Sequence, residues 1–377
     1  MSLPLEPYTV IDLTRARSGP TCVRQLADMG AKVVQIWARE DTGGDFPRRG
    51  FDSLNLQDPE GVKIFKQLAR ETDIVVENYR PGVKKRLGID YESLRQINPR
   101  LIYGSISGFG QSGPYRDRPG VDQIAQGMGG LMSITGIPGQ GPVRVGIPIA
   151  DLCSGILLAQ GILVALLERE ITGEGKWVHT SLLEAMLSML DFQASRWLMS
   201  GEVAPQAGNN HPTGIPTGVF ETKDGHINIA AAGDDIYTRL CRAIERPDLL
   251  TDPRFATAKA RSANRDVIME VLMPVTRQKP SAEWIALLNE AGVPCGPIYK
   301  INESFADPQV QHLAMAQPVH SPALGDLTIL GHPVSFGASR LPIRSNAPEL
   351  GQDNEEILTS IGYTKDQIAD LAKRGVI

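Results

Sequence analysis

The sequence predicts an α/β protein whose first half forms a largely parallel sheet covered by helices. Three observations support this prediction. Short β-rich runs alternate with helical segments, and the connections between them are brief. This alternation stops after about residue 195, where the chain becomes rich in Gly, Pro and Asn. Strands that alternate with helices in this way are typical of parallel sheets, because each helix returns the chain to the same end of the sheet.

The elements of the first half follow from hydrophobic spacing and from cap residues. A helix is expected at 20–31, where apolar residues recur at helical spacing and the run closes on Gly30, and another at 58–72, where Asp58 and Pro59 form a cap and first-turn signature. Runs rich in Val, Ile and Tyr predict strands at 8–13, 32–37, 73–79 and 101–107.

The second half has a different organisation. The stretch 201–218 is rich in Gly, Pro and Asn and is predicted to be a linker or an active-site loop. The stretch 218–233 is predicted to be a hairpin that turns at Lys223-Asp224-Gly225. Further helices are expected near 234–245, 263–279, 281–291 and 364–374. A chain of 377 residues with such a break is expected to form two domains.

Composition excludes several classes of function. A net charge of −5 argues against nucleic acid as a partner. The four cysteines are scattered without a CxxC pair, which favours a reducing, cytoplasmic location over a disulfide framework. The N-terminus lacks the pattern of a signal peptide. The most apolar run, 156–167, is too short to span a bilayer and is interpreted as a buried helix, so no membrane partner is expected.

The sequence argues against a dinucleotide-binding motif and against a metal site. The stretch "GFGQSG" at 108–113 matches the dinucleotide pattern GxGxxG, but Pro114, Pro119 and Gly120 follow it where a helix would have to open. It is therefore predicted to be a flexible loop. The six histidines show no metal-ligand spacing, and no metal site is expected.

Basic residues follow two of the predicted strands. Arg15 and Arg17 lie between the first strand and the first helix, a position that suits anion binding. The cluster "RPGVKKRLG" follows the third strand and adds Arg80, Lys84, Lys85 and Arg86. Clusters of charged residues ordinarily lie on a solvent-exposed surface and bind no ligand. At successive strand ends they would nevertheless converge on one edge of the sheet, where a nucleotide diphosphate could bind.

Asp151 is the acid at the start of the predicted apolar helix 152–168. Its simplest interpretation is an N-cap. The helix dipole and backbone N–H groups would also hold its carboxylate ionised, and an ionised, positioned carboxylate is what nucleophilic catalysis requires.

Taken together, the long motifs resemble one enzyme family. They include "IDLTRARSGPTCVRQLADMGAKVVQI", "DIVVENYRPGVKKRLGIDYESLRQINPRLIYGSISGFGQSGPYRDRPGVDQIAQGMGG" and "VGIPIADLCSGILLAQGILVALLEREITGEGKWVHTSLLEAML". This series is similar to the class III CoA-transferases, a family that also contains formyl-CoA and carnitine CoA-transferases and 2-methylacyl-CoA racemases. The resemblance covers nearly the whole chain.

The resemblance implies a Rossmann-like, CoA-binding large domain with a mostly parallel sheet, formed by 1–200 with 325–377. It implies a smaller α+β domain with its linkers at 201–324. Two chains would interlock as a homodimer, with each active site between the large domain of one subunit and the small domain of the other.

The resemblance also implies the reaction. Asp151 would attack an acyl-CoA thioester, form a mixed anhydride and then an aspartyl-CoA thioester, and pass CoA to an acceptor carboxylic acid. Acyl-CoA is then a substrate, and no permanently bound cofactor is expected. Both intermediates hydrolyse easily, so water must be excluded, and the loop from His211 to Gly218 is a candidate cover.

The CoA contacts of the family fall on seven positions of this chain. The first loop supplies Arg15, Arg17 and Ser18, and whether the two arginines meet CoA phosphates or a second carboxylate of a succinyl-like substrate stays open. The other positions are Arg39, Asn78, Tyr79 and Arg86.

One departure separates transferase from racemase. Racemases of the family carry a His in a "GHD" stretch that works with the motif Asp, and here Val121 occupies that place in "PGVDQ". Valine cannot exchange protons, so CoA transfer is favoured. A 2-methylacyl-CoA racemase or epimerase that uses another base, and a catalytically silent CoA-binding protein, are the alternatives.

Overall fold

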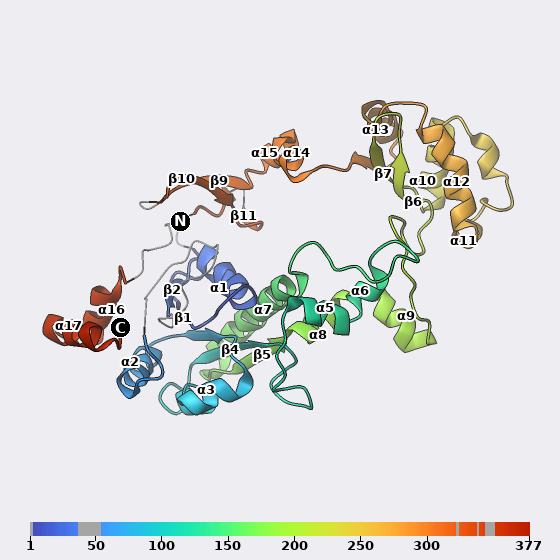
Figure 1. The fold of residues 1–377 in the computed structure, drawn as a ribbon. Helices are drawn as coiled ribbons and strands as arrows, with labels where there is room; N and C mark the ends of the chain where they lie inside the picture. Colours follow the sequence, from blue (N-terminus) through green and yellow to red (C-terminus); the bar gives the residue numbers. More distant parts are fainter. Residues whose placement is uncertain (1–2, 37–53, 322–323, 338, 344–350) are drawn as a thin grey trace. The chain divides into compact units, whose positions relative to one another are not determined.

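The computed structural model describes residues 3–36, 54–321, 324–337, 339–343 and 351–377. The chain divides into two compact units (Figure 1). The first comprises 1–131, 144–199 and 312–377, and the second comprises 132–143 and 200–311. Each unit is described by itself below.

A parallel five-stranded sheet forms the centre of the first unit, as the sequence predicts. Its order is β2-β1-β3-β4-β5, and every neighbouring pair is parallel. The strands are β1 (Thr9–Asp12), β2 (Lys32–Gln35), β3 (Ile74–Glu77), β4 (Ile102–Ser107) and β5 (Trp177–Ser181). The first four lie within the predicted runs, whereas β5 was not predicted.

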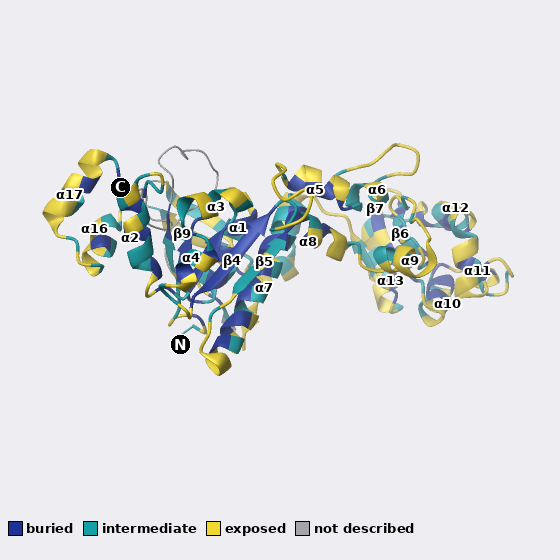
Figure 2. Cartoon of the chain, turned by 90° about the horizontal axis from the view of Figure 1, so that it is seen from below, coloured by how far each residue is buried: buried dark blue, intermediate teal, exposed yellow. Residues whose placement is uncertain are grey.

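Alternate residues of these strands enter two separate cores. On one face, Val10, Ile74 and Ile102 pack with apolar residues of α1 (Ser18–Asp28) and α7 (Ile149–Thr172). On the other face, Ile11 and Val75 pack with α2 (Pro59–Ala69), α4 (Tyr91–Arg95), α16 (Asn354–Ser360) and α17 (Lys365–Arg374). Helices therefore cover both faces, and β4 is buried along its length (Figure 2).

Several local predictions are confirmed. Asp58 caps α2 by accepting a hydrogen bond from Glu60 N at 2.8 Å, with Pro59 in the first turn. The "GFGQSG" stretch is a loop, with Gly110 and Gly113 at positive φ, and the next helix, α5 (Asp122–Met128), begins well beyond it. No helix dipole therefore meets these glycines, and the dinucleotide interpretation fails. The remaining helices of this unit are α3 (Pro81–Leu87) and α8 (Leu182–Met189). Helix α6 (Leu131–Ile134) begins at the last residue before the second unit, and α9 (Phe192–Ser200) ends at that unit's Ser200.

Helix α7 is the longest helix, and it is long and apolar enough to cross a membrane by those two criteria alone. Core helices of globular domains meet the same criteria. One face of α7, with Leu158, Ile162 and Leu166, is buried in the core of the first unit. Near its end, the buried Arg169 pairs with Asp73 at 2.9 Å. These contacts are those of a core helix.

The C-terminal part of the first unit also carries two short hairpins. Strands β9 (Ala316–Ser321) and β10 (Gly325–Leu330) pair antiparallel, as do β11 (Ser335–Phe336) and β12 (Ser339–Arg340).

The second unit is an α+β arrangement around an antiparallel sheet of order β6-β7-β8. Strands β6 (Thr217–Glu221) and β7 (His226–Ala230) form the predicted hairpin, and β8 (Cys295–Pro297) adds to it. The other elements are α10 (Asp234–Ala243), a 3₁₀ turn (Pro247–Leu250), α11 (Ala258–Ala263), α12 (Arg265–Thr276), α13 (Ser281–Glu290), α14 (Ile301–Ala306) and α15 (Pro308–His312).

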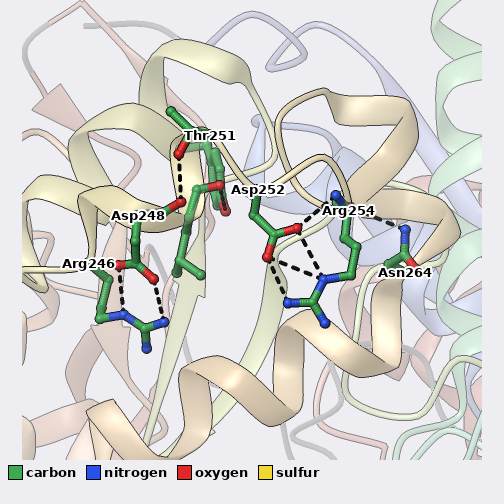
Figure 3. A network of polar contacts seen from close by, with 8 residues as sticks. Arg246, Asp248, Thr251, Asp252, Arg254 and Asn264 are labelled. Carbon is green, nitrogen blue, oxygen red and sulfur yellow. Dashed lines mark hydrogen bonds and ion pairs between the residues drawn. The ribbon is translucent and has the colours of Figure 1, made fainter.

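Polar contacts order the loops of the second unit. Arg246 pairs with Asp248, and Asp252 pairs with Arg254, whose carbonyl accepts from Asn264 (Figure 3). Arg261 is fully buried and donates to Ile215 O and to Asp234 Oδ1. The bond from Arg261 to Ile215 O holds the Gly- and Pro-rich loop at 211–218 against the body of its own unit.

Candidate active site at the head of helix α7

Asp151 lies in the first turn of α7, inside the helix and not at its cap. The helix begins at Ile149, its N-cap is Pro148, and no side chain of the cap residue bonds the helix. The prediction that Asp151 caps a helix at 152–168 is therefore wrong. The helix begins three residues before the predicted start, and one N–H group of its first turn, that of Ala150, has an acceptor elsewhere in the fold.

That acceptor is Asp122, at the start of α5. Its Oδ1 accepts a hydrogen bond from Ala150 N at 2.9 Å. Its Oδ2 accepts from Gln126 Nε2 at 2.8 Å and from Arg144 Nη2 at 3.3 Å. Asp122 is buried, so these bonds replace the water that its carboxylate loses. A side chain far away in the sequence thus caps the helix that carries Asp151.

The head of α7 also packs closely on α1. A Cβ placed on Gly155 would lie 2.5 Å from Ser18 O and 2.7 Å from Thr21 Cβ. Both are well inside van der Waals contact, so only glycine allows this approach. The glycine of "ADLCSG" thereby brings the start of α1, with Ser18, against the turn that carries Asp151.

The surroundings of Asp151 raise the pKa of its carboxyl from 3.8 to about 6. Burial is the largest cause, and the like charge of Asp122 acts in the same direction. A hydrogen bond from the Ser18 side chain and the charge of Arg17 lower it. The expected stabilisation of the carboxylate by the helix dipole is thus outweighed by the loss of water around it.

Asn78 joins the loops that follow β1 and β3. Its Oδ1 accepts from Arg15 N at 2.9 Å, and its Nδ2 donates to Arg15 O at 2.7 Å and to Ser18 Oγ at 3.4 Å. The chain order of the sheet reverses between these two strands, and ligands of such sheets bind at the point of reversal. The contacts therefore place Asn78 as the side chain that fixes the Arg15–Ser18 loop beside Asp151.

The arginines among the predicted CoA contacts are exposed where the structure describes them. Arg15 and Arg17 are exposed on that loop, and the Arg15 guanidinium lies 5.8 Å from the centre of the Tyr79 ring. Arg86 is exposed on α3. Arg39 lies outside the described residues.

Lys84 does not belong to an exposed basic cluster. Its ammonium is buried and contacts Glu77 Oε1 at 2.5 Å, Ser105 Oγ at 3.0 Å and Gln111 Oε1 at 2.8 Å. All three of its N–H groups therefore have a partner inside the protein. Lys84 ties α3 to β3, β4 and the loop after β4 and is unsuited to phosphate binding.

Sequence reasoning missed Asp122. An Asp at the start of a segment such as "VDQIAQGM" ordinarily caps its own helix, so its residue type and place in the sequence do not mark it as part of the site. In the structure Val121 is the N-cap of α5, and the Asp122 carboxylate faces the head of α7. Among the described residues, no group of three or more His, Cys, Asp or Glu side chains could hold a metal ion.

The family of the chain follows from comparison with known proteins. The model of CoA-transferase family III matches residues 5–354. The chain belongs to this family. The sequence-based resemblance is confirmed, and the protein is a class III CoA-transferase.

Curated relatives of this CoA-transferase align over nearly their full length. An acetyl-CoA:oxalate CoA-transferase of Acetobacter aceti is 37% identical, over 93% of both chains. A succinyl-CoA:mesaconate CoA-transferase of Haloarcula marismortui is 36% identical, over 95% of this chain and 96% of the relative. The human succinyl-CoA:glutarate CoA-transferase is 32% identical, over 99% and 90%.

Solved structures of the same family share the fold. A CaiB/BaiF family protein of Brucella suis superimposes with a TM-score of 0.82 at 33% identity, covering 96% of this chain and all of that one. The α/β fold with its parallel sheet is therefore that of the CoA-transferase family.

Proposed function

We propose that this CoA-transferase moves CoA from an acyl-CoA donor to a dicarboxylic acid and that Asp151 carries the CoA between them. The observation that carries the proposal is the Asp151 carboxyl at the head of α7, hydrogen-bonded by Ser18 and acted on by the charge of Arg17. With a pKa of about 6, about nine-tenths of it is ionised at pH 7. Partial burial leaves that carboxylate poorly solvated, and hence nucleophilic.

The transfer takes four steps. The Asp151 carboxylate attacks the thioester carbonyl and expels the CoA thiolate, which leaves a mixed anhydride. The thiolate attacks the aspartyl carbonyl, forms an aspartyl-CoA thioester and releases the donor acid. The acceptor carboxylate attacks that thioester and again expels the thiolate. Finally, the thiolate attacks the acceptor carbonyl, which yields the new acyl-CoA and frees Asp151.

The names of the relatives support dicarboxylic substrates. Glutarate, oxalate and mesaconate each carry two carboxylates, and these acids name three of the curated relatives. One carboxylate would react and the other would need a cation. Arg15 and Arg17 are exposed on the loop beside Asp151 and could serve either this carboxylate or a CoA phosphate.

A kinetic comparison separates these two roles of Arg17. If Arg17 pairs with the second carboxylate, Arg17→Gln raises the KM for the dicarboxylic acid and leaves the KM for acyl-CoA unchanged. If it pairs with CoA, the KM for acyl-CoA rises for every donor.

For CoA itself we propose contacts from Arg15, Arg17, Ser18, Tyr79 and Arg86, together with Arg39. The position of the first loop, between β1 and the N-terminus of α1, supports an anion site. Asn78 has a different proposed role, because its side-chain amide is already hydrogen-bonded to the Arg15 backbone and to Ser18. It would position the loop that contacts CoA.

Val121 supports transfer over racemisation. Its side chain is 61% exposed at the start of α5, next to the residue that caps α7. A valine there offers an apolar surface and no proton. Incubation of a 2-methylacyl-CoA in deuterated water without an acceptor acid tests this: α-carbon exchange would contradict the proposal.

We also infer that two chains associate. One side of α7 exposes Ile156, Val164, Leu167 and Ile171, and the last two are 70% and 87% exposed. Apolar side chains repeated along one helix face are typical of a surface covered by a partner.

Mass spectrometry after incubation with acyl-CoA tests the central step. A CoA adduct is expected on the peptide that carries Asp151, and hydroxylamine should remove it, since hydroxylamine cleaves thioesters. Asp151→Asn, which keeps the shape of the side chain, should form no adduct and show no transfer. Transfer activity retained by Asp151→Asn would contradict the proposal.

A further inference from the structure

The head of α7 is held in place from outside the helix. A helix leaves its first N–H groups without internal partners, and a side chain at the N-cap normally accepts one of them. Pro148 occupies the N-cap of α7 and offers no such side chain. Asp122 Oδ1 accepts from Ala150 N instead, and Ala150 directly precedes Asp151.

Asp122 is itself fixed by partners on two segments. Gln126, one turn later on α5, donates to Asp122 Oδ2, and its own Oε1 accepts from Val145 N at 3.0 Å. Arg144 pairs with the same Oδ2. The carboxylate of Asp122 therefore joins α5, the segment that leads into α7, and the first turn of α7. Displacing it would release the residue beside Asp151.

We propose that Asp122 is a positioning residue for Asp151: it caps α7 from α5 and so sets the place from which the Asp151 carboxylate attacks. This inference rests on the proposed role of Asp151 as the nucleophile. A reacting atom displaced by about 1 Å can cost about 100-fold in rate, so a cap next to the nucleophile acts on catalysis as well as on stability.

The charge of Asp122 has a second effect that a merely structural cap lacks. It opposes ionisation of Asp151, whereas Arg17 favours it. These are the two charges that shift Asp151. The other ionisable groups on elements packed against α7 are Cys22, Arg24 and Asp28 on α1, Tyr103 on β4, His179 on β5 and Glu184 on α8. Removing the Asp122 charge should therefore let Asp151 ionise at lower pH.

Two substitutions separate the cap from the charge. Asp122→Asn keeps an oxygen that can accept from Ala150 N and removes the charge, whereas Asp122→Ala removes both. Asp58→Ala is the matched control, because Asp58 caps α2 in the same unit, and α2 packs on the face of the sheet opposite to α7. The rate of adduct formation on Asp151 is measured in single turnovers between pH 4.5 and about 8, on variants whose circular dichroism is that of the wild type.

At pH 8 we expect Asp122→Ala to form the adduct about 10- to 100-fold more slowly than the wild type. Asp122→Asn should stay within about threefold, with the midpoint of its pH profile shifted to lower pH, and Asp58→Ala should match the wild type. The inference is overturned if Asp122→Ala reacts at the wild-type rate, or if Asp122→Asn keeps the wild-type midpoint. Failure of the wild type to form any adduct would instead refute the role of Asp151.

Discussion

Gly155→Ala tests the packing that brings Asp151 and Ser18 together. On helix propensity alone this substitution should stabilise the protein by about 1 kcal/mol, because alanine is the better helix former. The new Cβ, however, would lie 2.5 Å from Ser18 O. That oxygen belongs to the backbone and cannot rotate away, so α1 must move from α7. Such overpacking costs about 1–3 kcal/mol.

The expected net result is a loss of stability of up to about 2 kcal/mol. It would appear as a Tm lowered by about 2–4 °C for each kcal/mol in a unit of this size. Transfer should slow as well, since the movement draws the Ser18 hydroxyl away from the Asp151 carboxylate and removes a hydrogen bond that favours ionisation.

Gly146→Ala is the matched control. Gly146 lies just before the start of α7, and a Cβ there would meet nothing within 4 Å. This variant should keep the wild-type Tm and transfer rate. Thermal unfolding and steady-state transfer are measured on both variants. If Gly155→Ala raises the Tm and leaves the transfer rate unchanged, helix propensity outweighs overpacking at this position. The close approach of α1 to α7 then has no role in catalysis.

Three further predictions concern charge and assembly. Since the Asp151 carboxyl must be ionised to attack and burial raises its pKa to about 6, adduct formation should fall about tenfold between pH 7 and pH 5; a profile that is flat down to pH 5 would contradict the assignment. Lys84→Met leaves Glu77 as an unpaired buried charge and should destabilise the protein by about 3–5 kcal/mol in urea unfolding, with much of the loss restored by adding Glu77→Gln. Leu167→Asp should halve the molar mass in light scattering if the exposed face of α7 lies in a dimer interface, whereas an unchanged mass would place the interface elsewhere.

Local signals in the sequence were enough for much of the fold. The Asp58-Pro59 pair marked the start of α2, and the Val- and Ile-rich runs marked four strands, because cap chemistry and strand burial depend on neighbouring residues. Strand β5 was missed because its sequence, "WVHTS", has neither an apolar run nor a clean alternation. Its pairing with β4 is a long-range contact.

In the site too, local motifs were predicted correctly, whereas features set by contacts between residues distant in the sequence were missed. Asp151 was found from its motif, but the start of its helix was misplaced, because the cap comes from Asp122 on another helix. Lys84 was grouped with exposed basic residues, since its partner Glu77 becomes apparent only when α3 folds back on β3 and β4. Spacing along the chain carries no information about such pairings.

The most direct test of the account follows oxygen from the acceptor into the protein. In the four steps proposed, the acceptor carboxylate attacks the aspartyl thioester, and one of its oxygens remains on Asp151 when the new acyl-CoA leaves. Turnover with an ¹⁸O-labelled dicarboxylic acid should therefore place ¹⁸O in the peptide that carries Asp151, and nowhere else in the chain. Efficient transfer that leaves this peptide unlabelled would mean that the acceptor attacks the donor directly, and it would contradict a covalent role for Asp151.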